Sequence, residues 1–162
     1  MAYPSLQELK IRTGEFYLVK VTTHGGTSPE TMGQLQSFGY SDAYADRAYA
    51  RVGGTVKHVP GEENMRFQIR VFVDSDSKEL LLGMGHPLGQ TYSQDEEVQL
   101  NPDQGFDYEL IGYNGTGSSA SVEHKVKITN AKIRSASIAF VPGQGTLLTS
   151  AGTCDSITFI DV

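Results

Sequence analysis

Four histidines are the residues best suited to bind a metal ion or to transfer protons, and their spacing argues against both roles. They are His24, His58, His86 and His124. No two of them form the H-x-H or H-x-x-x-H spacing that would bring two imidazoles to one metal ion. His86 is the best candidate, because the glycines around it would let other groups approach the backbone. An irregular turn explains it more simply, so we predict no metal site and no cofactor.

Two acidic segments could supply carboxylate oxygens. Residues 74–76, Asp-Ser-Asp, begin like a calcium loop. The EF-hand pattern would then require an oxygen ligand, a glycine and a bidentate glutamate where this chain has Lys78, Glu79 and Gly85. The second segment, Gln-Asp-Glu-Glu at 94–97, consists of consecutive residues that are expected to be solvated. We therefore interpret the first as a turn and the second as a surface cluster, with an electrostatic contact as its alternative.

Nucleophilic chemistry has little support in the sequence. Cys154 is the single cysteine, which excludes an internal disulfide and a cysteine-rich zinc site. No histidine lies next to it, so a small buried apolar group is its expected role. The chain contains no G-x-S-x-G elbow and no phosphate-binding loop. We predict that the protein is not an enzyme and has no catalytic residues.

Composition excludes two further classes of partner. A net charge of -6 and a pI near 5.1 disfavour binding to nucleic acid, which requires clustered Lys and Arg. No apolar run approaches the roughly 18 residues of a membrane span. The first residues lack the basic and apolar regions of a signal peptide, so we expect synthesis in the host cytoplasm. A chain of 162 residues suits one domain.

Residues 65–73 carry the strongest structural pattern. Apolar and polar side chains alternate through most of this segment, and a strand turns successive side chains to opposite faces. The apolar members are Met65, Phe67, Ile69, Val71 and Val73, and the polar ones are Arg66, Gln68 and Arg70. The pattern predicts a strand with one buried face. Phe72 interrupts the polar face with an apolar group, which a subunit or partner contact would use.

Short strands separated by turn residues extend along the whole chain. Gly53-Gly54 suits the turn of a hairpin between strands at 48–52 and 55–59. Residues 24–40 show no sustained period and are predicted to form a long loop, and residues 42–50 suit a helix or a strand. The other predicted strands are 15–23, 79–84, 91–100, 106–113, 120–129, 132–141 and 154–161.

Together these elements predict an all-β fold. We expect an antiparallel two-sheet sandwich of jelly-roll-like form at residues 14–162. Residues 1–13 carry the S-x-x-E capping pattern of a short helix at Ser5 and Glu8, and are expected to form an N-terminal arm.

Apolar, aromatic and flanking residues on the arm, the predicted loop and the 65–73 strand are the candidate partner-binding residues. Tyrosine is typical of interfaces because it offers rigid, amphipathic contact area. Packing at the edge of the core and stacking on sugars remain alternatives for the tyrosines. The candidates are Tyr3, Leu6, Leu9, Met32, Leu35, Phe38, Tyr40, Tyr44, Arg70 and Phe72.

The opening Met1-Ala2-Tyr3-Pro4-Ser5-Leu6 and the glycine-punctuated strands resemble those of tailed-bacteriophage capsid decoration (cement) proteins of the jelly-roll or β-sandwich type. This resemblance implies a structural virion protein, a homotrimer on the capsid surface that bridges subunits of the major capsid protein. A carbohydrate- or receptor-binding module of a virion is the alternative. The absence of tryptophan counts against sugar binding.

Overall fold

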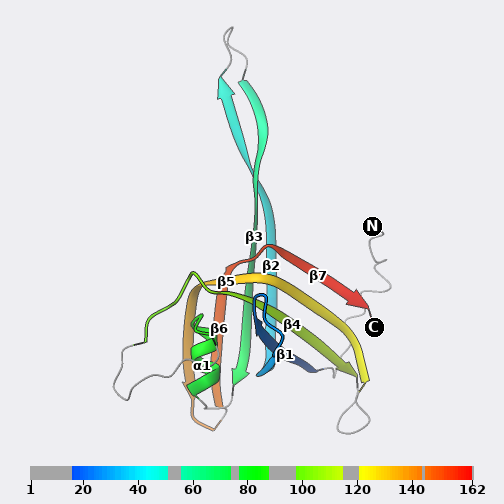
Figure 1. The fold of residues 1–162 in the computed structure, drawn as a ribbon, viewed down its shortest axis with the longest axis vertical. Coiled ribbons are helices and arrows are strands. Elements are labelled where there is room, and N and C mark those ends of the chain that lie inside the picture. The colour runs from blue at the N-terminus through cyan, green and yellow to red at the C-terminus, as the bar shows by residue number, and fades with distance from the viewer. Residues whose placement is uncertain are drawn as a thin grey trace.

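The computed structural model describes residues 16–50, 56–73, 77–87, 98–114, 121–143 and 145–161, and these are almost entirely β-structure. Figure 1 shows their arrangement, in which a rounded body carries one long hairpin. The strands are β1 (Phe16–Thr23), β2 (Glu30–Ala50), β3 (Val56–Val73), β4 (Gly105–Asn114), β5 (Ser121–Val141), β6 (Gly145–Thr153) and β7 (Ser156–Asp161), and helix α1 (Ser77–Gly83) follows β3.

Six of the strands close into an antiparallel barrel. Their order is β4-β1-β2-β3-β6-β5, and the sheet closes because β4 also pairs with β5. The closing pair runs from Gly105 opposite Lys132 to Asn114 opposite Ser121. β7 lies outside this ring of strands and pairs with the first half of β5. The predicted all-β class is confirmed, and the predicted two-sheet sandwich gives way to a barrel with an added strand. Both folds bury alternate side chains, so the alternation in the sequence cannot distinguish them.

The strand predicted at 65–73 has the faces that its pattern indicated. Phe67, Ile69, Val71 and Val73 are buried in the core, and Met65 is partly buried. Arg66, Gln68 and Arg70 are exposed on the other face. The core inside the barrel is completed by the remaining buried apolar side chains, Val19, Val21, Met32, Leu82, Phe106, Tyr108, Leu110, Val126, Ile128, Ala131, Ile133 and Leu148.

β2 and β3 form a hairpin that is much longer than predicted. β2 begins at Glu30, so the long loop expected at 24–40 shrinks to residues 24–29. The pairing of β2 with β3 then extends from Gln34 opposite Phe72 to Ala50 opposite Val56, and two bulges shift its register. Residues 60–64, which separate the predicted strands at 55–59 and 65–73, are instead continuous strand within β3. In Figure 1 the far half of this hairpin projects well beyond the barrel.

β5 is also one strand where two were predicted. It bends at Asn130, whose φ of 50° lies in the left-handed region that asparagine tolerates. Before the bend β5 pairs with β4 and β7, and after it β5 pairs with β6. The bend therefore lets a single strand serve both the barrel and the added strand β7.

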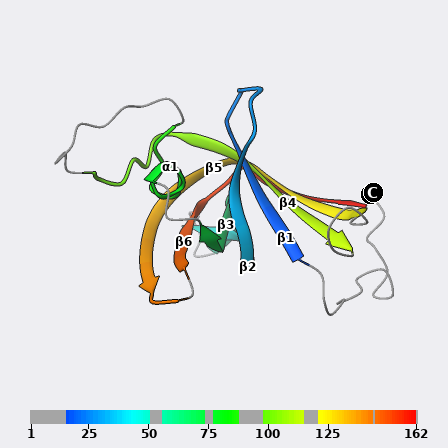
Figure 2. The same cartoon turned by 90° about the horizontal axis from the view of Figure 1, so that it is seen from below.

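Two elements differ from the prediction: one strand was not predicted, and one predicted strand is a helix. β6 was not predicted, because its sequence from Gly145 to Thr153 is rich in Gly, Ser and Thr and has no charged residues to mark a polar face. Residues 79–84, predicted as a strand, belong mostly to α1. The Leu80-Leu81-Leu82 run that suggested a strand instead places Leu82 in the core. Figure 2 shows α1 next to β6, and Ser150 of that strand donates a hydrogen bond to the Gly83 carbonyl at 2.9 Å.

The remaining predictions lie wholly or mostly outside the described residues. These are the arm at 1–13, the Gly53-Gly54 turn and most of the strand at 91–100, of which residues 98–100 are irregular.

Candidate assembly surfaces

The described part of the chain offers no centre for catalysis or metal binding. No group of three or more His, Cys, Asp or Glu side chains gathers there in a way that could hold a metal ion. Cys154 is half-buried, and its burial, followed by the charges of Asp155 and Asp42, raises the pKa of the thiol to about 11. A thiol with so high a pKa is a poor nucleophile at neutral pH.

A polar cluster ties the start of β4 to the bend of β5. His24 Nδ1 donates to Asp107 Oδ1 at 2.9 Å, and the Asn130 amide donates to the same oxygen at 2.9 Å. The Asn130 side chain donates to Asp155 Oδ2 at 2.9 Å. Partial burial disfavours the charged form of Asp107, but these hydrogen bonds and the charges of His24 and Lys127 lower its pKa. Each bond joins two strands or their connections, so this cluster holds the bend in place.

Three aromatic side chains on β2 and β7 form a row at the edge of the core, since Phe38 and Phe159 are paired with the buried Ile69 and Val126. The rings of Phe38 and Tyr40 on β2 lie 6.0 Å apart, and the ring of Phe159 on β7 lies 5.7 Å from Tyr40. Tyr40 and Phe159 are 52% and 54% exposed, which is unusual for large apolar side chains on a folded protein. We call Phe38, Tyr40 and Phe159 the aromatic row. It joins β7 to the hairpin that carries β2.

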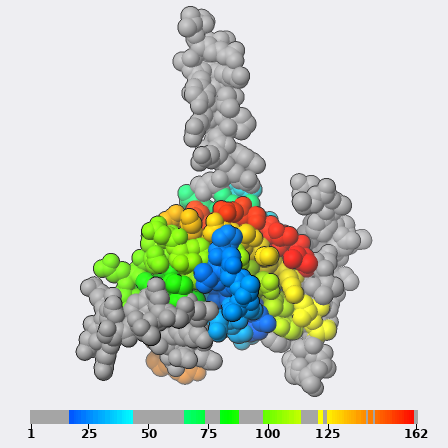
Figure 3. All heavy atoms as spheres, in the orientation of Figure 1, coloured from blue at the N-terminus to red at the C-terminus, as the bar shows by residue number. Residues whose placement is uncertain are grey.

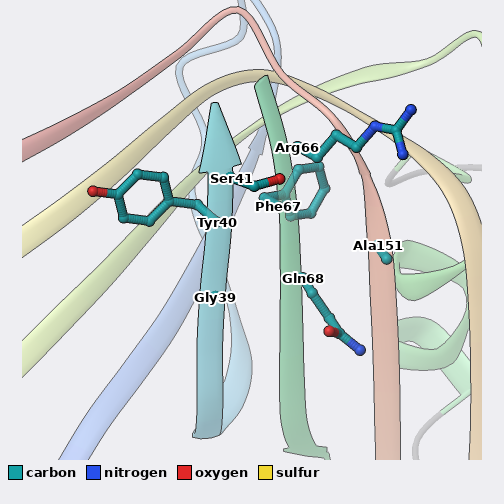
Figure 4. A pocket seen from close by; sticks show the side chains of 7 residues that line it. All are labelled: Gly39, Tyr40, Ser41, Arg66, Phe67, Gln68 and Ala151. Atoms are coloured by element: carbon teal, nitrogen blue, oxygen red, sulfur yellow. The ribbon is translucent and has the colours of Figure 1, made fainter. Parts of the chain in front are cut away.

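A shallow hollow of about 390 Å³ lies beside the aromatic row, between β2, β3 and β6. Figure 4 shows the Arg66 and Gln68 side chains over this surface, with Tyr40 pointing away from them. A guanidinium, an amide and the Ser41 hydroxyl can bind a polar or acidic group, but the lining holds no acid–base pair. The lining residues are Gly39, Tyr40, Ser41, Arg66, Phe67, Gln68 and Ala151.

A third exposed aromatic side chain among the described residues stands apart from the row. Phe140, next to the end of β5, is 70% exposed. The end of β5 and strand β7 lie on opposite sides of the barrel in both ribbon views (Figures 1 and 2). Figure 3 shows β7, in red, at the surface beside the start of β5. The barrel thus presents large apolar groups on two separate sides.

The predicted partner-binding residues separate into distinct environments. Met32 is 1% exposed and lies in the core, while Leu35 and Phe38 are partly buried against it. Tyr40 and Arg70 are exposed, and Phe72 is partly buried. Tyr44 lies on β2 opposite Glu63 in the projecting hairpin. Tyr3, Leu6 and Leu9 lie outside the described residues. The structure brings Phe38 and Tyr40 together, and it removes Met32 from the surface.

Sequence reasoning missed Phe140 and Phe159. Both lie in predicted strands, where an apolar residue was expected to face the core. Phe159 is exposed because it lies on the added strand β7, and Phe140 because it lies near the end of β5. Neither position could be assigned to the surface from strand alternation.

Comparison with known proteins identifies similar folds but no family. No protein-family model and no curated protein matches the sequence. A chain of the anti-feeding prophage baseplate, solved with six-fold symmetry, matches with a TM-score of 0.54 at 13% identity, over 100% of this chain and 99% of that one. A chain of an extracellular contractile injection system, from the PVC sheath–tube complex in its extended state, matches with a TM-score of 0.51 at 16% identity, over 99% and 100%.

These likenesses correct the expectation of a capsid decoration protein. The similar chains come from contractile injection systems, and their fold covers this chain end to end. The expected major capsid protein partner, the homotrimer and the capsid-surface location are therefore wrong, as is the carbohydrate- or receptor-binding alternative. Within the described ranges, no helix has the length and apolar character of a transmembrane helix.

Proposed function

We propose that this protein is a structural, non-enzymatic subunit of the tube of a contractile injection system, and that it assembles with copies of itself into rings. The observation that carries this proposal is the correspondence of its fold with a chain of a sheath–tube complex, over 99% of this chain and 100% of that one. The proposed location is an injection particle of this kind.

The surface of the barrel supports self-assembly. A subunit that worked alone would be expected to bury large apolar groups, yet Phe140, Phe159 and Tyr40 are each more than half exposed. The end of β5, which carries Phe140, and strand β7, which carries Phe159, lie on opposite sides of the molecule (Figures 1 and 2), so each copy can contact two neighbours. Repetition of one such contact closes a ring when a whole number of these rotations makes one full turn.

The projecting hairpin supports the stacking of rings. The far halves of β2 and β3 pair only with each other among the described strands, from Ala43 opposite Asn64 to Ala50 opposite Val56. A two-stranded ribbon has little stability of its own in water. We propose that it becomes covered by a neighbouring ring.

The mass in solution and electron microscopy of the purified chain test the proposal. By analogy with the six-fold baseplate, we expect a particle of six times the 17.6 kDa chain mass and ring-shaped images with six-fold symmetry. Light scattering coupled to gel filtration gives the mass, and negative-stain images give the symmetry. A protein that stays monomeric at every accessible concentration, with no rings in the images, would overturn the proposal.

A further inference from the structure

The hairpin formed by β5 and β6 carries an exposed surface without charge. Residues 135–154 include no Asp, Glu, Lys or Arg, although 20% of the whole chain is charged and a run of 20 residues would carry about four. Several of these residues are exposed all the same, and Phe140 is 70% exposed. The others are Ser135, Ser137, Ala139, Pro142, Gly143 and Gly145. We call residues 135–153 the uncharged hairpin.

An exposed surface of this composition is typical of the centre of a protein interface. Interface centres are depleted of charged residues and enriched in aromatic ones, whereas solvated strands are normally marked by Lys and Glu. The core-facing side of the uncharged hairpin carries Ala136, Ile138 and Leu148, and Phe140 follows on the same side near the end of β5, where it is exposed. The other side, with Ser135, Ser137 and Ala139, is exposed and has no role in the fold of the single chain that would explain its lack of charge.

The aromatic row supplies the matching surface on the other side of the barrel. In a ring every contact is head-to-tail, so two different surfaces of the same chain must fit each other. The end of β5 and strand β7 lie on opposite sides of the body in Figures 1 and 2. Among the described strands, β7 pairs only with β5, and no other described strand pairs with its second edge.

We propose that the uncharged hairpin of one copy packs against the aromatic row of the next, with Phe140 seated beside Tyr40 and Phe159. This inference rests on the proposed ring and names its contact. It explains why Phe140, Phe159 and Tyr40 are each more than half exposed in the single chain. Aromatic pairs that become fully desolvated dominate interfaces of this kind.

Three single variants test the contact. Phe140→Ser and Phe159→Ser each remove one side of the contact. Ile160→Ser is the matched control, because Ile160 is also exposed, at 39%, but lies on the opposite face of β7. We expect the first two to raise the protein concentration at which rings dissociate by at least about tenfold, as truncation of a buried aromatic anchor does. Ile160→Ser should shift it less than about threefold. Circular dichroism and urea unfolding of the dissociated chains should match the wild type.

Cross-linking tests the same contact without disturbing it. Asp42 and Pro142 are exposed and lie two residues after Tyr40 and Phe140. In a Cys154→Ser background, Asp42→Cys and Pro142→Cys together should give a ladder of linked subunits with a short bismaleimide, and neither cysteine alone should do so.

The outcomes separate this inference from the proposed function. If the wild type forms rings, but both Phe variants dissociate like the wild type and the double-cysteine protein gives no ladder, the ring stands and this contact is wrong. Equal losses in Phe159→Ser and Ile160→Ser would also refute it. If the wild type forms no rings, the proposed function and the contact fail together.

Discussion

Gly152 lies next to the end of β6, and its replacement by alanine should be among the most damaging single-atom additions to this fold. A Cβ at this position would lie 1.9 Å from the Lys132 carbonyl oxygen, 2.9 Å from the carbonyl carbon and 3.0 Å from the Arg134 nitrogen. All three are backbone atoms of β5, so no side-chain rotation can relieve the contact. β6 must move away from β5 at the bulge between Ile133 and Ser135.

The expected cost follows from the pairing that such a movement would break. Gly152 is paired with Phe67 on β3 and with Ile133 on β5, so it occupies a central strand. The added Cβ and the Lys132 carbonyl oxygen, 1.9 Å apart, must move to an ordinary contact distance. This movement separates β6 from β5 and breaks about two backbone hydrogen bonds. Each lost bond costs roughly 1–3 kcal/mol when its groups stay buried. We expect the free energy of unfolding to fall by about 2–4 kcal/mol.

Gly39→Ala is the matched control, because Gly39 also lies inside a strand but a Cβ there would meet nothing within 4 Å. Its substitution should be neutral or stabilising by up to about 1 kcal/mol through the unfolded state. Urea unfolding followed by circular dichroism, at one fixed protein concentration because assembly adds to apparent stability, measures both variants. If Gly152→Ala unfolds within about 0.5 kcal/mol of Gly39→Ala, the proposed backbone clash is wrong.

Three further predictions concern titratable groups. The Tyr108 hydroxyl is buried without a hydrogen-bond partner among the described residues, so Tyr108→Phe should leave the free energy of unfolding unchanged or raise it by about 1 kcal/mol; a clear loss in urea unfolding would reveal a hidden partner. The lowered pKa of Asp107 means that its ionised form stabilises the fold above the unfolded-state pKa of about 4, and that this contribution disappears as the pH falls through the lower folded-state pKa. In Asp107→Asn the free energy of unfolding should therefore fall less steeply as the pH drops below about 4. An unchanged dependence on pH in this range would exclude the role of Asp107. Because the pKa of Cys154 is raised to about 11, its thiol should react with Ellman's reagent at pH 8 roughly a hundredfold more slowly in the folded protein than in urea; equal rates would contradict its burial.

Several features of the fold could be read from local sequence. The alternation at 65–73 correctly assigned Phe67, Ile69 and Val71 to the core, because the two faces of a strand are set by a period of two residues. Residues 106–113 and the last strand were placed nearly as observed. Of the candidate contact residues, Tyr40 proved exposed, but Met32 proved to be core, since its surroundings depend on how far β2 extends.

The sequence by itself therefore determined that the chain forms antiparallel strands with one apolar face, because backbone geometry converts a local pattern directly into faces. Tertiary structure decided that those strands close into a barrel, since the pairing of β4 with β5 joins segments that no local pattern relates. Tertiary structure also decided which apolar residues remain exposed outside the core. Phe140 and Phe159 have the same side chain as the buried Phe67 and Phe106, and only their places near the end of β5 and on the added strand β7 leave them exposed.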